Sequence, residues 1–293
     1  MTSIDQADDA RPVLVLGGTG KTGRRVAAGL MARGQAVRIA TRNTSPAFDW
    51  ADRDGWAAAL AGCRAAYIAY APDLVAAGAV DDIAAFAALA MDQGVRRLVL
   101  LSGRGEPAAA AAERALAASG ADWTVIRASW FNQNFTESLM RDGIAVGHLA
   151  LPVGDMPEPF IDARDIADVA VRALTDVDLD VGPDVDPGRR RHIGRIHELT
   201  GPRLLSFADA TAEIARATRR PIVYTTIPLA DFLAGLAEAG VPAPLQDLMA
   251  ELFSTLFDGR NARVTDTVLQ VTGRPPRDFA DFAREAAGAG AFG

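Results

Sequence analysis

Hydrophobic and polar residues follow a repeating strand–helix pattern in the first part of the chain. Four apolar residues at positions 13–16 predict a buried parallel strand. The stripe of Val26, Leu30 and Met31 predicts an amphipathic helix, which Gly34 ends. Because runs of these two kinds keep alternating, we expect an α/β fold with a doubly wound parallel sheet of the Rossmann type. Such a sheet binds its ligand at the carboxyl ends of the strands.

The pattern also predicts the remaining strands of this sheet and the helices between them. The other expected strands are 36–40, 47–50 (short, or a remnant), 65–70, 97–101 and 123–126. The helices expected between them cover 56–60, 81–91 and 106–119, and Asp52 and Asp54 precede the first of these as N-caps.

After residue 126 the regular alternation of strands and helices ends. We expect a helix over 130–140, a strand over 146–151, and a strongly patterned helix over 163–174 capped by Asp162. Further on, the expected elements are strands 196–199 and 222–226 and helices 206–218, 228–239, 244–257, 265–271 and one from 278. Residues 176–195 read as a flexible surface loop. The sequence therefore predicts an NAD(P)-binding domain over 12–150 and a smaller substrate-binding domain over 151–287, interleaved with the first.

Glycines between the first strand and helix are spaced G-x-x-G-x-x-G, a relative of the dinucleotide fingerprint. Gly17 permits a tight turn, Gly20 lets a pyrophosphate approach the backbone, and Gly23 lets the helix pack closely. The helix N-terminus offers free N–H groups and a positive dipole end to phosphate. The other turn residues of this candidate cofactor site are Thr19, Lys21 and Thr22.

A phosphate-binding loop for ATP is the competing interpretation of the same turn. Residues 20–22 read Gly-Lys-Thr, as at the end of a P-loop. That motif requires a glycine at position 15, and Val15 stands there inside the strand. ATP binding is therefore disfavoured.

The end of the second strand indicates which nicotinamide nucleotide is preferred. An acidic residue there selects NAD, whereas an arginine accommodates the 2′-phosphate of NADP. The chain has Arg42 with no acid beside it, which favours NADP over NAD; the alternative is an ordinary surface arginine. Asp52, Tyr70 and Ser102 are further cofactor-site candidates, since they lie near or at strand ends. Helix capping for Asp52, and a cap or turn for Ser102, are the competing roles.

Composition and charge limit the classes of protein to which the chain can belong. The chain has 293 residues, 49% of them hydrophobic, so it can bury a large core. No apolar run reaches the roughly 18 residues of a membrane helix, and the polar N-terminus has no signal-peptide core. A single cysteine, Cys63, excludes an internal disulfide, and these facts favour a cytoplasmic protein without a membrane partner. The net charge of −7 argues against a nucleic-acid partner. No residues have metal-ligand spacing, and His192 and His197 are expected on the surface.

Several segments together resemble the NmrA-like group of atypical short-chain dehydrogenases/reductases, most of all the ergot-alkaloid reductases of the festuclavine and agroclavine dehydrogenase type. The similarity runs from about Val13 to Phe282, and Met156–Pro159 departs from the pattern. The segments are Gly17–Gly23, Phe48–Trp50, Trp123–Phe135, Phe160–Ala167 and Val271–Pro276. The resemblance implies NADPH-dependent reduction of a cyclic iminium. The group also includes quinone and azo reductases and a redox-sensing regulator.

Short-chain dehydrogenases commonly protonate their substrate with a tyrosine whose pKa is lowered by a lysine four residues later. This chain has one lysine, Lys21, and no lysine follows Tyr67, Tyr70 or Tyr224 at that spacing. Three readings stay open. The protein reduces an iminium or a quinone-like acceptor that needs no such acid, it senses NADP without catalysis, or it is a non-redox biosynthetic enzyme.

The substrate is expected to be a flat or cyclic small molecule. Trp130, Phe131 and Asn134 follow the last strand of the sheet, where aromatic rings stack on a flat substrate or simply pack in the core. Asn134 either anchors a ligand or caps a helix. The candidate catalytic residues are Tyr70, Ser102 and His148, with a structural role as the alternative for His148. The sequence leaves the oligomeric state open.

Overall fold

The structure is a computed structural model that describes residues 11–176 and 191–293. The chain divides into two compact units, between which it passes several times. The described residues of unit 1 fall in 11–103, 107–127 and 166–198, and those of unit 2 in 104–106, 128–165 and 199–293. Most of the segment expected to be a surface loop, residues 177–190, lies outside the described residues.

A six-stranded sheet with the strand order β2-β1-β3-β4-β5-β7 forms the centre of unit 1. In the parallel pairs of β1 with β2 and β3, Val13 lies opposite Val37 and Ala65. Every residue of β1 and β3 is buried, as expected for strands covered on both faces. The strands are β1 (Val13–Leu16), β2 (Val37–Ala40), β3 (Ala65–Ile68), β4 (Arg97–Gly103), β5 (Asp122–Ala128) and β7 (Arg195–Leu199).

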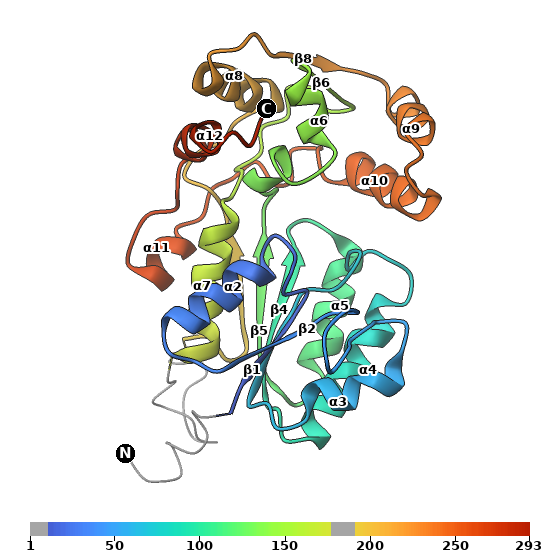
Figure 1. Cartoon of the computed structure of the whole chain (residues 1–293), viewed down its shortest axis with the longest axis vertical. Helices are drawn as coiled ribbons and strands as arrows, with labels where there is room; N and C mark the ends of the chain where they lie inside the picture. The colour runs from blue at the N-terminus through green and yellow to red at the C-terminus, as the bar shows by residue number, and fades with distance from the viewer. Residues whose placement is uncertain (1–10, 177–190) are drawn as a thin grey trace. The chain divides into compact units, whose positions relative to one another are not determined.

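Helices cover both faces of this sheet (Figure 1). On one face, α2 packs against α7 at Gly29, where a Cβ atom would lie 3.0 Å from a methyl group of Val171. The opposite face carries α3, α4 and α5. The doubly wound α/β fold is therefore confirmed. The helices are α2 (Gly23–Ala32), α3 (Trp56–Leu60), α4 (Ala79–Asp92), α5 (Pro107–Ala117) and α7 (Ala163–Thr175).

The expected strand over 47–50 does not form. Its alternating pattern comes from Phe48 and Trp50, whose rings are buried edge to face at 4.9 Å in a cluster with Trp56 and Phe86. The Trp56 indole N–H donates to the Asp49 carbonyl at 2.8 Å. The segment is therefore irregular backbone that delivers two aromatic rings to the core.

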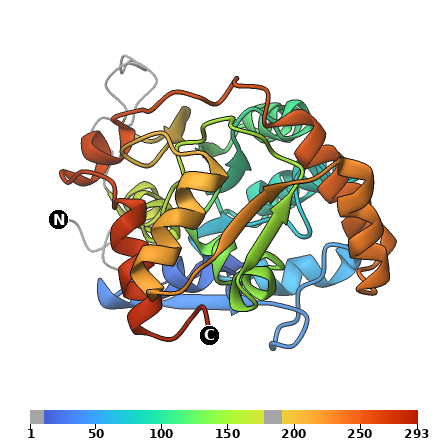
Figure 2. The same cartoon turned by 90° about the horizontal axis from the view of Figure 1, so that it is seen from above.

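Unit 2 contains a two-stranded parallel sheet of β6 (His148–Leu151) and β8 (Val223–Thr226) and several helices. Figure 2 shows α12 beside α8. Buried phenylalanines fill the interior, among them Phe135, Phe160, Phe207 and Phe279, with ring centroids 5.0–5.9 Å apart. The helices are α6 (Met140–Ala145), α8 (Phe207–Thr218), α9 (Leu229–Glu238), α10 (Ala243–Thr255), α11 (Thr267–Thr272) and α12 (Phe279–Gly288). Across both units, no described helix has the length and hydrophobicity needed to cross a membrane.

Side chains cap several of the helices, and the expected cap at Asp162 is confirmed. Ser206 and Asp209 form a reciprocal capping box at α8, and Asp278 caps α12. Asp162 accepts the Arg164 N–H at 2.8 Å in the first turn of α7. Asp52 is an exception, because it precedes the 3₁₀ turn η1 (Arg53–Gly55) but its side chain makes no capping bond.

The helix expected over 130–140 is also wrong. Trp130 and Phe131 continue the extended course of β5, since Phe131 forms a parallel bridge with Ile161. The Asn132 N–H donates to the Ile161 carbonyl at 2.8 Å. A short 3₁₀ helix, η2 (Asn132–Phe135), follows, and α6 begins later at Met140. Pairing with a segment about thirty residues away overrides the local helical pattern.

The sequence motifs of unit 2 contact one another. The Gln133 amide donates to Asp162 at 3.0 Å and accepts the Ala163 N–H at 2.7 Å. Asp165 is fully buried and accepts the Arg277 N–H at 2.7 Å. It also forms ion pairs with the guanidinium groups of Arg274 and Arg277. These residues therefore fasten the start of α7 to the segment that precedes α12.

His192 and His197 are buried, so the expectation of surface positions is wrong. Their ring nitrogens lie 3.1 Å apart, and His192 lies 3.5 Å from Asp176. Burial, together with His192 and Arg195 nearby, lowers the pKa of His197 to about 4.

The buried Asp165 should contribute strongly to stability. In Asp165→Asn we expect the free energy of unfolding to fall by about 3 kcal/mol, because two arginines and a backbone N–H lose a carboxylate partner. Urea unfolding measures this. Asp281→Ala, which removes an exposed ion pair with Arg284, is the control and should cost less than about 1 kcal/mol. Equal effects of the two substitutions would contradict the assignment.

His197 should make the protein less stable in acid. Its pKa is about 4 when folded and near 6.5 when unfolded. Between these values the unfolded chain binds a proton that the folded chain does not, so stability falls as the pH falls. The slope is at most about 1.4 kcal/mol per pH unit. Urea unfolding at several pH values should show a smaller acid loss in His197→Gln than in the wild type, while the exposed His148→Gln should match the wild type. Identical pH profiles for all three proteins would refute the prediction.

Candidate functional site

In the turn between β1 and α2, the backbone at Gly17 lies very close to the backbone at Gly20 and Gly23. Gly17 has φ of +66°, and the Gly20 N–H donates to its carbonyl at 2.8 Å. A Cβ atom at Gly23 would lie 2.2 Å from the Gly17 oxygen. The glycine at 23 is therefore needed because the turn folds back on itself. Gly18, which the sequence reading did not single out, leaves room for Ile39 of β2, since a Cβ there would lie 2.5 Å from that side chain.

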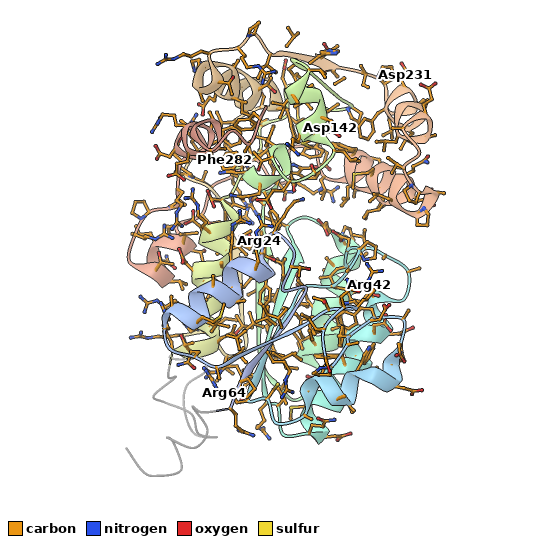
Figure 3. All side chains as sticks on the ribbon, viewed as in Figure 1. Arg24, Arg42, Arg64, Asp142, Asp231 and Phe282 are labelled. Atoms are coloured by element: carbon orange, nitrogen blue, oxygen red, sulfur yellow. The ribbon has the colours of Figure 1, made fainter. Side chains whose placement is uncertain are left out.

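The N-terminus of α2 suits an anionic ligand. Thr22 occupies the N-cap position but makes no capping bond through its side chain, and the first turn contains no acidic residue. The Arg24 N–H donates to the Gly20 carbonyl at 3.2 Å and the Arg25 N–H to the Thr22 carbonyl at 3.0 Å. The helix dipole makes this end of α2 positive. The exposed Arg24 lies in the same turn (Figure 3), and Arg25 donates to the Lys21 carbonyl at 2.5 Å. The backbone and charge of this turn therefore fit a phosphate group.

Arg42 follows β2 and is exposed (Figure 3). The loop that carries it is held by Thr44, whose hydroxyl accepts the Thr41 N–H at 2.8 Å and lies 2.9 Å from the Pro46 carbonyl. The Arg42 guanidinium makes no hydrogen bond or ion pair with another residue of 11–176 or 191–293. Arg38, in contrast, is bound to the carbonyls of Ala59 and Ala61. Arg42 is thus an exposed cation that follows the carboxyl end of β2.

Tyr70 follows the carboxyl end of β3, and Asp52 precedes η1. The Tyr70 ring is 4.6 Å from that of Trp50, and its hydroxyl donates to Asp82 at 2.8 Å. Burial and the Asp82 carboxylate raise the pKa of Tyr70. Trp50 and Asp82 therefore hold the Tyr70 side chain in place, and its raised pKa makes it poorly suited to release its proton. Asp52 is exposed.

Ser102 belongs to a buried polar network. Its hydroxyl donates to Glu113 of α5 at 2.6 Å, and the Arg127 Nε donates to the same carboxylate at 2.8 Å. The hydrogen bonds that Arg127 donates to Glu113 raise the pKa of Arg127. Helix α5 thus presents a buried glutamate that joins β4 to β5.

The remaining titratable candidates lie in other surroundings. His148 is exposed on β6, with its Nε2 2.9 Å from the Thr225 hydroxyl. The Tyr224 hydroxyl donates to the Val153 carbonyl at 2.5 Å, and burial raises its pKa to about 12. Tyr67 is fully buried in β3, which also raises its pKa.

The aromatic candidates of unit 2 have different environments. Trp130 is half-buried among phenylalanine rings, 5.7 Å from Phe253 and 5.3 Å from Phe257. Phe131 is half-buried beside Ile161. Asn134 lies in η2, where its carbonyl accepts the Ser138 hydroxyl at 2.5 Å.

Two polar residues near these positions were missed by the sequence reading. Glu158 is 3% exposed, and its carboxylate accepts the Trp130 N–H at 3.3 Å. Burial raises its pKa to about 7, although the Trp130 N–H and the charge of Arg104 oppose this. Asn132 is 0% exposed. Neither has a local signal, since Glu158 stands between two prolines without periodicity and Asn132 lies beside the more prominent Asn134.

Among the described residues, no three His, Cys, Asp or Glu side chains are grouped closely enough to hold a metal ion.

Comparison with known proteins agrees with this geometry. A family model described as NAD(P)H-binding matches residues 17–177. The uncharacterized oxidoreductase YesF of Bacillus subtilis is 34% identical over 288 residues, covering 93% of this chain and 94% of that protein. Agroclavine dehydrogenase of Claviceps fusiformis is 28% identical over 294 residues, covering 93% and 96%.

A solved structure of NmrA, a negative transcriptional regulator in complex with NAD, has the same fold. It matches with a TM-score of 0.70 and 17% identity, over 96% of this chain and 97% of that chain. The chain thus belongs to the NAD(P)H-binding family and is an NAD(P)H-dependent oxidoreductase.

Proposed function

We propose that the protein is an NADPH-dependent reductase that transfers hydride to an imine, an iminium ion or a quinone-like small molecule without a Tyr–Lys pair. The observation that carries the proposal is the uncapped, acid-free N-terminus of α2 behind the glycine turn. This end of the helix suits the diphosphate of a dinucleotide.

Unit 1 supplies the residues that would hold the nucleotide. The backbone of Gly17–Gly23 receives the diphosphate, and Arg42 pairs with the 2′-phosphate that distinguishes NADPH from NADH. Tyr70 and Asp52 border the nucleotide, and Ser102 lies near it at the end of the sheet. When bound, NADPH supplies a hydride, which carries two electrons to the acceptor.

The surroundings of the tyrosines support an acceptor that does not depend on an ionisable phenol. Tyr70 and Tyr224 donate to Asp82 and Val153, and Tyr67 is enclosed in the core. An iminium ion is neutralised by hydride alone, and a quinone gives a product whose oxygens are acidic. In both cases the protein mainly positions the reactants. Trp130 and Phe131 are our candidates for contact with a flat ring, with Asn134 as a polar anchor.

Arg42→Ala should weaken NADPH binding about 10–100-fold, because it removes a charged hydrogen bond worth about 1.5–3 kcal/mol. NADH binding should change little. Fluorescence titration of both nucleotides measures the two dissociation constants. Arg96→Ala, at an exposed position elsewhere on unit 1, is the matched control. Equal losses for NADPH and NADH would remove Arg42 from the 2′-phosphate site.

Purified protein should oxidise NADPH when it is given a panel of quinones and cyclic iminium ions, with saturable kinetics followed by nicotinamide absorbance. Gly23→Ala should abolish both NADPH binding and turnover, since the added methyl group collides with the Gly17 carbonyl. Circular dichroism checks that this variant keeps its fold. Saturable NADPH binding by the wild type without turnover of any acceptor would favour a nucleotide sensor instead.

A further inference from the structure

Ser102 and Glu113 are buried polar residues whose pairing gives the end of β4 a defined hydrogen-bonding character. Ser102 is the next-to-last residue of β4 and is 4% exposed. Glu113 lies on α5 and is also 4% exposed. Both residues belong to unit 1, as do their further partners Arg127 and Glu198. The cluster is therefore a feature of the nucleotide-binding unit alone.

The Ser102 hydroxyl has one proton, and its partner shows where that proton points. The hydroxyl lies 2.6 Å from Oε1 of Glu113. Both carboxylate oxygens of Glu113 accept the Nε–H group of Arg127, at 2.8 and 3.0 Å. A carboxylate that is paired with a guanidinium accepts hydrogen bonds and donates none. Ser102 is therefore the donor, and its proton points to Glu113.

The remaining hydrogen-bonding capacity of Ser102 is of one kind. A hydroxyl oxygen has lone pairs in addition to its single proton. Because that proton is given to Glu113, the oxygen can only accept a further hydrogen bond. No group within residues 11–176 and 191–293 donates to it. A ligand group that contacts Ser102 must therefore be a hydrogen-bond donor.

The network is anchored at the ends of three neighbouring strands. Ser102, Arg127 and Glu198 are the next-to-last residues of β4, β5 and β7, which are adjacent in the sheet. Arg127 Nη1 lies 3.5 Å from Glu198. The hydrogen bonds to Glu113 raise the pKa of Arg127, so the guanidinium remains charged. These contacts fix the Glu113 carboxylate, and through it the direction of the Ser102 proton.

The order of the strands places Ser102 at a suitable distance from the glycine turn. β4 is two strands away from β1 through the parallel pairs β1–β3 and β3–β4. Neighbouring strands lie about 4.8 Å apart, so the end of β4 is roughly 10 Å from the end of β1. A dinucleotide lies across the carboxyl ends of such strands. Arg42 follows β2 on the other side of β1, so the nicotinamide half extends over β3 and β4.

We propose that Ser102 accepts a hydrogen bond from the nicotinamide riboside half of the bound nucleotide, and that Glu113 and Arg127 are positioning residues that make Ser102 an acceptor. This rests on the proposed NADPH-dependent function and adds the chemistry of the second half of its nucleotide site. The donors on that half of NADPH are the carboxamide N–H groups and the ribose hydroxyls. A nucleotide analogue separates these two sources.

Glu113→Gln should reverse the hydrogen bond to Ser102. Oε2 of Glu113 accepts both Nε–H and Nη2–H of Arg127, so the amide oxygen takes that place and the amide nitrogen faces Ser102. The amide then donates to Ser102, whose own proton turns toward the donor on the nucleotide. We expect NADPH to bind about tenfold more weakly in a fluorescence titration. Binding of 2′,5′-ADP, which has only the adenosine half, should not change. Glu238→Gln, an exposed glutamate of α9, is the matched control and should behave as the wild type.

Ser102→Ala removes the acceptor without changing Glu113. It should also weaken NADPH binding about tenfold and leave 2′,5′-ADP binding unchanged. Ser102→Thr keeps the hydroxyl and suits a strand, so it should retain wild-type affinity for NADPH. A purely structural role of the network would instead change the affinities for both nucleotides together.

The reduced 3-acetylpyridine analogue of NADPH keeps a carbonyl group on the ring and lacks the amide N–H groups. If the carboxamide is the donor, the wild type should bind this analogue about tenfold more weakly than NADPH, and Ser102→Ala should bind it as the wild type does. If a ribose hydroxyl is the donor, the wild type should bind both nucleotides equally, and Ser102→Ala should weaken both.

The outcomes separate this proposal from the proposed function itself. A wild type that binds no NADPH overturns both. Wild-type NADPH binding together with unchanged affinity in Ser102→Ala overturns the role of Ser102 and leaves the reductase function standing. Equal losses of NADPH and 2′,5′-ADP in Glu113→Gln and Ser102→Ala, with lowered melting temperatures, assign the network to structure and also overturn the proposal.

Discussion

The near contact between Gly23 and the Gly17 carbonyl is the constraint on which unit 1 depends. A Cβ atom at position 23 would come within 2.2 Å of that oxygen, so the turn closes only with a glycine there. Closing the turn aims the N-terminus of α2, without a capping side chain, at the space beyond β1. The same turn brings Gly18 against Ile39 and so places β2 beside the turn. The glycines therefore set both the course of the turn and its packing against β2.

The buried carboxyl groups of the protein differ in the number and kind of their hydrogen-bond partners. The Ser102–Glu113–Arg127 network and the Asp165 ion pairs satisfy their members and join distant segments. Asp162 shows how burial and hydrogen bonds shift the pKa of a carboxyl group in opposite directions. Burial would raise its pKa, but its bonds with Arg164 and Gln133 outweigh burial and lower the pKa. Glu158 has weaker support from the Trp130 N–H and Arg104, so burial prevails there and raises the pKa. Two buried carboxyl groups of one unit thus differ because their hydrogen-bond partners differ.

The motifs that carry the family resemblance serve mostly to hold unit 2 together. Gln133, Asp162 and Asp165 come from two of these motifs and bond to each other or to the Arg274–Arg277 segment. Such residues stabilise the fold, because they join segments that lie far apart in the sequence. They say little about the acceptor, because their polar atoms are already used within the protein. Residues with unused hydrogen-bonding capacity, such as Asn132, are more informative about the ligand.

The amino-acid sequence by itself determined the elements that depend on neighbours within a few positions. The β1 strand, the glycine turn, α2 and the cap at Asp162 are of this kind, because strand burial, positive φ and capping bonds are local. The tertiary structure decided the rest. In the folded protein, residues 47–50 place two aromatic rings in the core, and residues 130–131 form an extended segment. Both depend on contacts with residues far away in the sequence. The tertiary structure also buried His192 and His197, and it gave Glu158 its shifted pKa, since burial and charge come from segments that no local pattern specifies.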